Sequence, residues 1–233
     1  MIIVILCGGK GRRLMPFTEE TPKTLVPLNG KPLLDYNLEL FSSKKLNNFI
    51  LCIGYKGEKI REHIKKMQNS TPYNITFSDA GKNASMLKRI YKLKEEVSGM
   101  TLVIYGDTLT NIDVNDFKNH HINKGKAVSI VVASIQNPFG LVTFNEDGVA
   151  VSFQEKPYLN YYIGMFILSK SAFDYIDDQM LKEPDGEGLV SFFKRLIDEK
   201  QLMVYHYTGK QITFNTHKEK EIAEEVIKTF FTL

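Results

Sequence analysis

The chain has 233 residues, of which 43% are apolar and 24% charged, and its formal net charge is +3. This composition is ordinary for a globular protein long enough to bury a substantial core. The small net charge and the absence of a Lys/Arg run argue against a nucleic-acid partner. The opening apolar run, Met1–Leu6, is too short for a signal-peptide core or a membrane span. We therefore expect a cytoplasmic protein without a membrane partner.

The first half of the chain alternates strand patterns with helix patterns. Such alternation favours right-handed crossovers and an α/β fold, here a Rossmann-like mixed sheet that is mainly parallel and has helices on both faces. Cys7 and Cys52 lie inside apolar runs, so we interpret them as core residues and not as a disulfide or metal pair. The predicted strands are 2–7, 49–54, 73–77 and 101–105, and the predicted helices are 31–45, 56–68 and 84–97.

The second half predicts a small β-hairpin elaboration on the same sheet. A β-branched run covers 126–135, and residues 140–153 are typical of a hairpin that turns at Asp147-Gly148. Asp113 begins a capping segment for the helix after it. Further strands are predicted at 161–168 and 202–207, and helices at 169–178, 187–200 and 216–230.

The end of the first predicted strand carries the most informative motif. Cys7–Leu14 reads CGGKGRRL, and Pro22-Lys23 follows about ten residues later. Glycines at the end of a buried strand let backbone N–H groups approach a ligand, and nearby cations suit a polyphosphate. Arg12, Arg13 and Lys23 can converge on one anion. The motif therefore predicts a nucleotide site at the carboxyl ends of the first strands.

Two common phosphate-binding patterns do not fit this loop. Gly9 and Gly11 match G-x-G, but Leu14 stands where the dinucleotide fingerprint has its third glycine, which disfavours a dehydrogenase. The chain also has no G-x4-G-K-S/T phosphate loop.

The combination of the glycine loop, Pro22-Lys23 and Gly30-Lys31-Pro32 resembles the signature of nucleotidylyltransferases that join an NTP to a sugar 1-phosphate. The resemblance covers almost the full length and implies one domain over 1–233, with a nucleotide-binding half (1–110) and an acceptor-binding half (111–233). Segments similar to those of glucose-1-phosphate cytidylyltransferases are Phe49–Gly57, Leu87-Lys88-Arg89, Gly106-Asp107, Phe139-Gly140 and Ser152–Pro157.

In the reaction that this resemblance implies, an acceptor phosphate oxygen attacks the α-phosphorus of the NTP, with CTP favoured, and pyrophosphate leaves. No covalent intermediate is required, so catalysis is mainly positioning and charge stabilisation. The implied catalytic residues are Arg13, at the β- and γ-phosphates, and Lys23, at the α-phosphate. The other implied nucleotide-binding residues are Leu6, Cys7, Gly8, Gly9, Gly11 and Arg12.

The resemblance also implies a Mg²⁺ site. Asp107 follows the strand at 101–105, and a carboxylate at the end of a buried strand is well placed to hold Mg²⁺ against an α-phosphate. The alternative for Asp107 is an Asx turn or a helix cap. Asn215 stands where the family has a second metal-binding aspartate. Its amide oxygen can coordinate Mg²⁺ but carries no formal charge, so we expect weaker metal binding.

The acceptor residues implied by the resemblance are Glu155, Lys156, Tyr162 and Gly164. Lys156 would contact the acceptor phosphate and Glu155 the acceptor hydroxyls, although an exposed Glu-Lys-Pro turn is the simpler alternative. Tyr162 brings more bulk than the Asn-Gly-Gly of glucose-type enzymes, which we expect to narrow a hexose pocket. Three alternatives stay open: a phosphorylated amino alcohol as acceptor, a phosphorylated amino-acid derivative, or a non-catalytic nucleotide-sensing subunit. Homo-oligomer formation is a further expectation.

Overall fold

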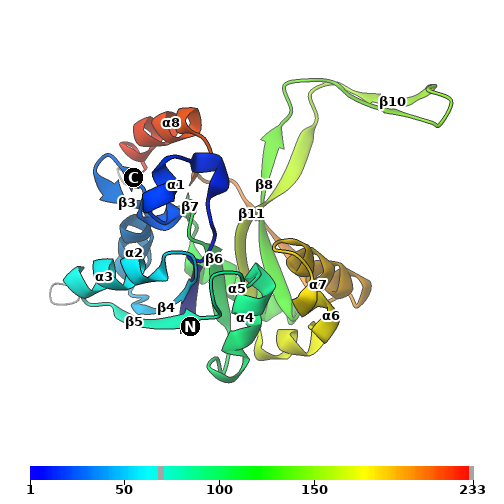
Figure 1. Ribbon diagram of the computed structural model, residues 1–233. Coiled ribbons are helices and arrows are strands. Elements are labelled where there is room, and N and C mark those ends of the chain that lie inside the picture. Colours follow the sequence, from blue (N-terminus) through cyan, green and yellow to red (C-terminus); the bar gives the residue numbers. More distant parts are fainter. Residues whose placement is uncertain (68–70, 231–233) are drawn as a thin grey trace.

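One large mixed sheet organises the molecule (Figure 1), for which the computed structural model describes residues 1–67 and 71–230. Strand β11 runs antiparallel to both of its neighbours, β6 and β8, and the other neighbouring strands pair in parallel. The predicted α/β sheet is therefore confirmed. Its strands in spatial order are β12 (Leu202–Tyr207), β8 (Val128–Gln136), β11 (Tyr158–Leu168), β6 (Thr101–Tyr105), β1 (Ile2–Leu6), β4 (Asn48–Ile53) and β5 (Asn74–Asp79).

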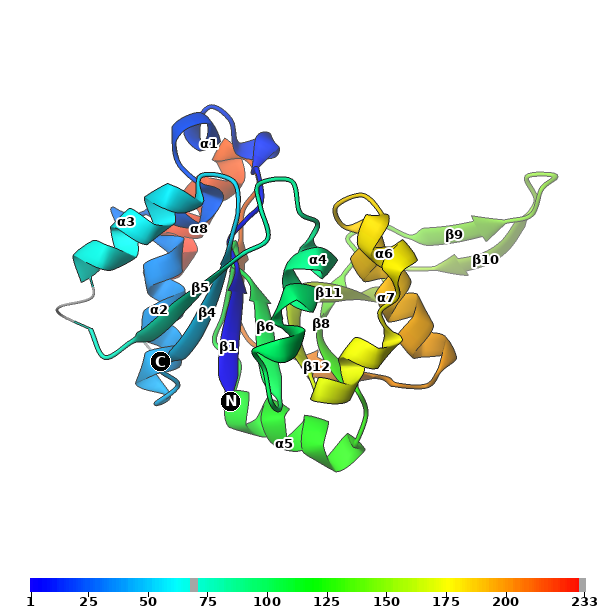
Figure 2. The same ribbon diagram turned by 60° about the horizontal axis from the view of Figure 1, so that its bottom comes forward.

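Helices cover both faces of this sheet (Figure 2). Successive strand residues point to opposite faces, so Ile3 and Ile5 join one buried cluster and Val4 the other. Burying each such side chain stabilises the fold by about 1.5–3 kcal/mol. Among the described residues, no helix is long and apolar enough to span a membrane. The first cluster packs under α2 (Leu33–Ser43), α3 (Gly57–Met67) and α5 (Val114–Lys124), and the second under α4 (Met86–Tyr91), η3 (Lys92–Glu95), η4 (Lys170–Tyr175), α6 (Asp178–Lys182) and α7 (Glu187–Asp198).

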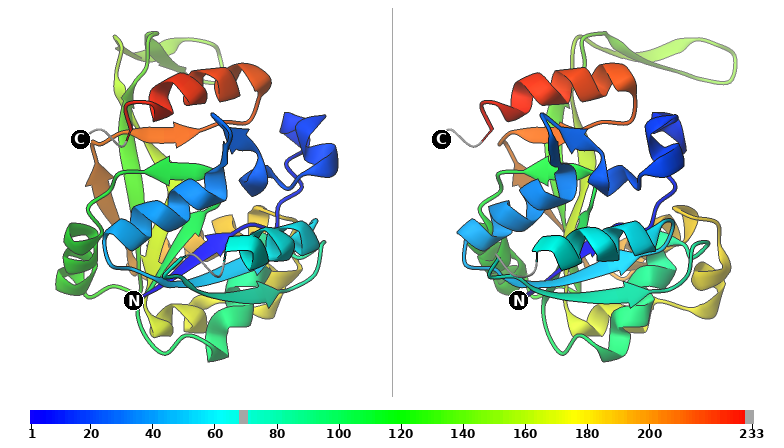
Figure 3. Two further views of the ribbon diagram at one scale, coloured as in Figure 1. Left: turned by 90° about the vertical axis from the view of Figure 1, so that its left-hand side faces the viewer. Right: turned by 60° about the vertical axis from the view of Figure 1, so that its left-hand side comes forward.

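A smaller layer lies beside the carboxyl end of β1, and sequence patterns did not predict its short strands. β13 (Gln211–Thr213) pairs antiparallel with β7 (Thr108–Thr110), and α8 (His217–Ile227) packs over them (Figure 3). This pairing brings Asn215, just after β13, toward Asp107, just before β7. The layer also contains η1 (Arg12–Leu14), α1 (Phe17–Glu20), η2 (Lys23–Leu25), β2 (Pro27–Leu28) and β3 (Lys31–Pro32).

Most predicted elements are confirmed with shifted ends, but the helix predicted over 169–178 is shorter than expected and is a 3-10 helix. Residues Lys170–Tyr175 form the 3-10 helix η4, and a new helix, α6, begins at Asp178. Asp177 accepts hydrogen bonds from the backbone N–H groups of Gln179 and Met180, at 2.9 Å each. Such an N-cap has an extended backbone, which separates the two helices. Asp113 caps α5 in the same way, as predicted. Residue 68, at the end of one predicted helix, lies outside the described residues.

The predicted hairpin is present and stands away from the body (Figures 1 and 2). We call it the arm: β9 (Leu141–Phe144), β10 (Ala150–Gln154) and their turn. Its polar face includes a hydrogen bond between the hydroxyls of Thr143 and Ser152, at 2.6 Å. The apolar side chains of the arm include Val142, Phe144, Val151 and Phe153, each at least 45% exposed. The arm is therefore an apolar ribbon in contact with solvent.

Candidate active site

A cavity of about 380 Å³ opens at the carboxyl ends of β1 and β6. Open α/β sheets commonly bind ligands at this position. The structure brings together there all the residues that the sequence nominated for nucleotide and metal. The nominated residues in its lining are Leu6, Cys7, Gly8, Gly9, Gly11, Arg12, Arg13, Lys23, Asp107 and Asn215.

The glycine loop is shaped by its own hydrogen bonds and by the left-handed backbone of Gly11. Gly11 has φ +59°, and a Cβ there would lie 2.9 Å from Cγ2 of Thr18. The Thr18 hydroxyl donates to the Gly11 carbonyl at 2.9 Å. At the other end of the loop, the backbone N–H of Cys7 donates to the carbonyl of Cys52 at 2.9 Å. The loop is thus held at both ends, with η1 and its two arginines following it.

Lys23 lies at the centre of the polar cluster. Its Nζ donates to Oδ2 of Asp107 at 2.6 Å and to Oδ1 of Asn215 at 3.0 Å. The Lys23 side chain is only 11% exposed, while that of Asp107 is 30% exposed. The ammonium also lies 5.6 Å from the ring centre of Phe214. A half-buried cation is therefore held in the cavity by one carboxylate and one amide oxygen.

The same two oxygens form a donor set suitable for a hard cation. Both already bind one positive centre, the Lys23 ammonium, so they converge on a single point. Mg²⁺ takes oxygen ligands and is commonly held by one or two side chains together with substrate phosphates and water. Asp107 and Asn215 fit that description.

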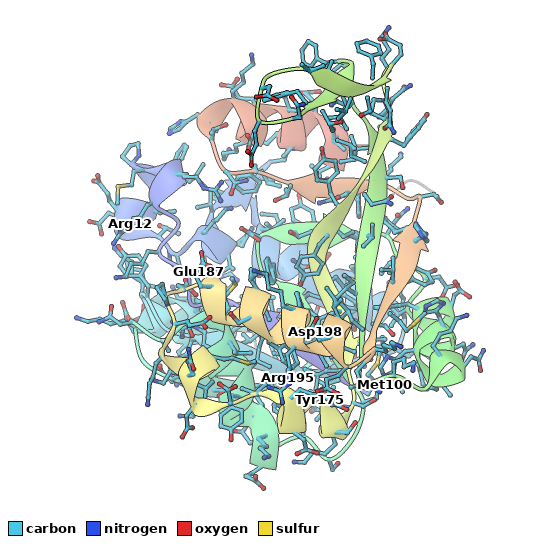
Figure 4. All side chains as sticks on the ribbon, turned by 90° about the vertical axis from the view of Figure 1, so that its right-hand side faces the viewer. Arg12, Met100, Tyr175, Glu187, Arg195 and Asp198 are labelled. Atoms are coloured by element: carbon cyan, nitrogen blue, oxygen red, sulfur yellow. The ribbon has the colours of Figure 1, made fainter. Side chains whose placement is uncertain are left out.

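Positive charge gathers on the glycine-loop side of the cavity. Lys10, Arg12 and Arg13 line it, and Lys10 donates to Oδ1 of Asn83 at 3.2 Å. Figure 4 shows Arg12 beyond the end of α7 marked by Glu187, while Asp198 marks the other end of that helix. Cations clustered beside a glycine-rich backbone turn suit an anionic ligand.

The cavity also contains residues that sequence reasoning did not assign to it. Asp185, before α7, accepts a hydrogen bond from the backbone N–H of Met86 at 2.8 Å. Burial raises the pKa of Tyr105 to about 12, so its phenol stays protonated. Arg89 is 4% exposed and also lines the cavity. Its only signal in the sequence was its place in the Leu87-Lys88-Arg89 segment.

The nominated acceptor residues do not lie in the lining of this cavity. Glu155 and Lys156 join β10 to β11 and are 65% and 58% exposed, with Oε1 and Nζ 3.9 Å apart. Tyr162 packs edge-on against Tyr105, with ring centres 5.8 Å apart, and Gly164 packs against the same ring. Tyr162 therefore does not line the cavity itself but packs behind Tyr105, which does. The acceptor roles of these four residues stay predictions.

Comparisons with known proteins agree with this geometry. The profile of the family described as "Nucleotidyl transferase" matches residues 2–211. A Bacillus subtilis protein that carries the assignment "probable glucose-1-phosphate cytidylyltransferase" is 32% identical, over 94% of this chain and 92% of its own. The glucose-1-phosphate cytidylyltransferase of Salmonella typhi is 28% identical, over 96% and 95%.

A solved structure from Bacillus anthracis shows the same fold. It is assigned as a glucose-1-phosphate thymidylyltransferase and was solved in complex with sucrose. It superposes with a TM-score of 0.74 at 18% identity, over 97% of this chain and 95% of its own. The profile match and the Bacillus subtilis relative confirm the resemblance drawn from the motifs. The chain therefore belongs to the nucleotidyl transferase family and is a nucleotidyltransferase enzyme.

Proposed function

We propose that this enzyme transfers a nucleoside monophosphate from an NTP, by preference CTP, to a sugar 1-phosphate. In this reaction an acceptor phosphate oxygen forms a bond to the α-phosphorus. The bond between the α-phosphorus and the bridging oxygen breaks, and pyrophosphate leaves with the electron pair. The observation that carries the proposal is the convergence of Lys23, Asp107 and Asn215 in a cavity edged by the glycine loop.

Lys23 and Arg13 have the main catalytic roles in this proposal. Both reactants are anions, so their repulsion and their alignment are the main barriers. Lys23 offers its half-buried ammonium to the α-phosphate oxygens, where charge grows in the transition state. Arg13 stabilises the β- and γ-phosphates that depart, and Arg12 adds to that grip.

The proposed cofactor is Mg²⁺, held by the carboxylate of Asp107 and the amide oxygen of Asn215. When bound, it would neutralise charge on the α-phosphate. Lys23 would then exchange its present hydrogen bonds with Asp107 and Asn215 for contacts to phosphate. Because only one of the two side chains is charged, we expect a weak metal site that is completed by the nucleotide.

The assignments of two relatives support both the proposed nucleotide and the proposed acceptor. The assignments of the Bacillus subtilis and Salmonella typhi relatives support CTP. They also support a sugar 1-phosphate in preference to a phosphorylated amino alcohol or amino-acid derivative. The division into a nucleotide-binding half (1–110) and an acceptor-binding half (111–233) stays a prediction, and in this proposal Asp185 and Asn215 of the second half also face the nucleotide.

A pyrophosphate-release screen tests this proposal. It crosses CTP, UTP, dTTP, GTP and ATP with sugar 1-phosphates and with small non-sugar phosphates, in the presence of Mg²⁺. We expect release with CTP and a hexose 1-phosphate. Pyrophosphate release only with a non-sugar phosphate would show that the acceptor is not a sugar 1-phosphate. Background release throughout, with nucleotide still bound, would identify a nucleotide-sensing subunit.

We also propose that the chain forms a homo-oligomer through the arm. A solvent-exposed two-stranded ribbon is marginally stable by itself. Phe144 and Phe153 are 70% and 67% exposed on it, and contiguous exposed apolar surface commonly marks a contact with another chain. We take the partner to be a second copy of this chain, in line with the homo-oligomer expected from the sequence.

A further inference from the structure

Arg89 is a buried cation beneath the glycine loop that the proposed reaction does not use. It projects from α4 and is 4% exposed. Its guanidinium donates from Nη1 to the carbonyl of Ile53 and from Nη2 to the carbonyl of Gly8, the latter at 3.3 Å. In the part of the chain that the structure describes, no carboxylate lies within ion-pair distance of it. A buried charge without an ionic partner is costly to keep.

The backbone around Arg89 leaves room for this side chain at two places. A Cβ on Gly8 would lie 2.3 Å from Cζ of Arg89, and one on Gly54 would lie 2.4 Å from its Nη1. Gly8 follows β1 and Gly54 follows β4, so two separate strand ends both require glycine here. The guanidinium therefore occupies a fixed position between neighbouring strands at the cavity wall.

Arg89 still has donors to offer a ligand. A guanidinium has five N–H groups, and the two carbonyls occupy two of them. Asp185 also lines the cavity and accepts the Met86 N–H. Arg89 lies between the ends of β1 and β4, whereas Asp107 follows β6. In the strand order β6-β1-β4 these two positions lie on opposite sides of β1. A nucleotide with its phosphates at Lys23 can therefore place its base toward Arg89.

We propose that Arg89 reads the nucleobase by donating to two adjacent acceptors, which in cytosine are O2 and N3. Uracil and thymine carry a hydrogen at N3 and would oppose one of these donors. Paired donors of arginine are the usual protein group for two neighbouring base acceptors, with discrimination of about 10- to 100-fold against the wrong base. This inference rests on the proposed function and adds the residue that selects the nucleotide.

The first test changes the ligand and leaves the protein intact. Binding of CTP, UTP and the triphosphate of 3-deazacytidine, which has a C–H in place of the N3 acceptor, is measured on the wild-type protein by calorimetry. We expect CTP to bind about 10-fold or more tightly than either of the others. Equal affinities for CTP and 3-deaza-CTP would overturn the proposal. This readout is separate from turnover, so it stands even if no acceptor supports pyrophosphate release.

The second test changes Arg89. Arg89→Lys keeps the charge but loses the paired donors, and Lys88→Gln, an exposed neighbour on α4 outside the cavity lining, is the matched control. We expect Arg89→Lys to weaken CTP about 10- to 100-fold, to leave UTP within about threefold, and to abolish the difference between CTP and 3-deaza-CTP. A uniform loss for all nucleotides would show a structural role alone. A loss confined to GTP would overturn the assignment to cytosine.

Discussion

Replacing Lys23 with alanine removes the positive charge at the centre of the proposed site. The ammonium is 11% exposed and within hydrogen-bond distance of both Asp107 and Asn215, so solvent replaces it poorly. Loss of one preorganised group that stabilises transition-state charge typically lowers kcat by about 10²- to 10³-fold, or about 3–4 kcal/mol. We expect a loss at the upper end of that range, because the reaction brings two anions together.

The same substitution should affect stability much less. An exposed ion pair contributes about 1 kcal/mol or less, and breaking a fully buried one costs about 3–5 kcal/mol. Asp107 keeps 30% exposure and can be hydrated once Lys23 is gone. We therefore expect a cost of about 1–2 kcal/mol, which corresponds to a fall in Tm of about 2–8 °C in a chain of this size.

Steady-state pyrophosphate release and thermal melting separate the two effects. Lys31→Ala is the matched control, because Lys31 pairs with Glu39 and lies 4.5 Å from the Tyr36 ring centre, outside the cavity lining. The control should melt slightly lower and keep its kcat. A Lys23→Ala enzyme with near-normal kcat would refute the reasoning and remove Lys23 from the catalytic residues.

Three further predictions concern the metal, the arm and the buried thiols. Asn215→Asp should lower the Mg²⁺ concentration needed for half-maximal activity, because a carboxylate adds charge to the site; an unchanged Mg²⁺ titration would place Asn215 away from the metal. Replacing Phe144 and Phe153 together with serine should lower the mass measured by light scattering, and an unaltered mass would exclude the arm as the interface. Burial raises the pKa of Cys7 and raises that of Cys52 to about 12. Thiols of the unfolded chain ionise near pH 8.5, so below that pH they do not favour unfolding. Above it, ionisation stabilises the unfolded chain, and this loss of stability grows until the pH reaches the folded pKa values. The Tm should therefore fall between pH 8 and 10, and by less in Cys52→Ala; an equal fall in both proteins would contradict this cause.

Much of the fold was predictable because hydrophobic periodicity marks the elements that bury apolar surface. The strand at 101–105 and the hairpin turn at Asp147-Gly148 are examples, since each has a strong local pattern. The helix predicted over 169–178 ends early, at Tyr175, because Asp177 has an extended backbone that caps α6, whereas the apolar pattern continues through that break. Strands as short as β7 and β13 have no periodicity of their own and form by pairing with each other.

The site divides in the same way. The glycine loop and Asp107 were accessible because they follow strands whose positions can be read from the hydrophobic pattern, and Lys23 was accessible through the Pro22-Lys23 motif. Their distances to Asn215 were not, because they depend on the β7–β13 pairing across about a hundred residues. Arg89 was hidden for another reason: a basic residue on an amphipathic helix is usually solvated, and only the structure shows that this one is buried beside Gly8 and Gly54.

A structure of the enzyme with a non-hydrolysable CTP analogue and Mg²⁺ tests the central claim most directly. The account predicts the triphosphate between Arg13 and Lys23, the metal at Asp107 and Asn215, and the base against Arg89. An analogue bound elsewhere, or bound with its phosphates away from Lys23, would contradict it.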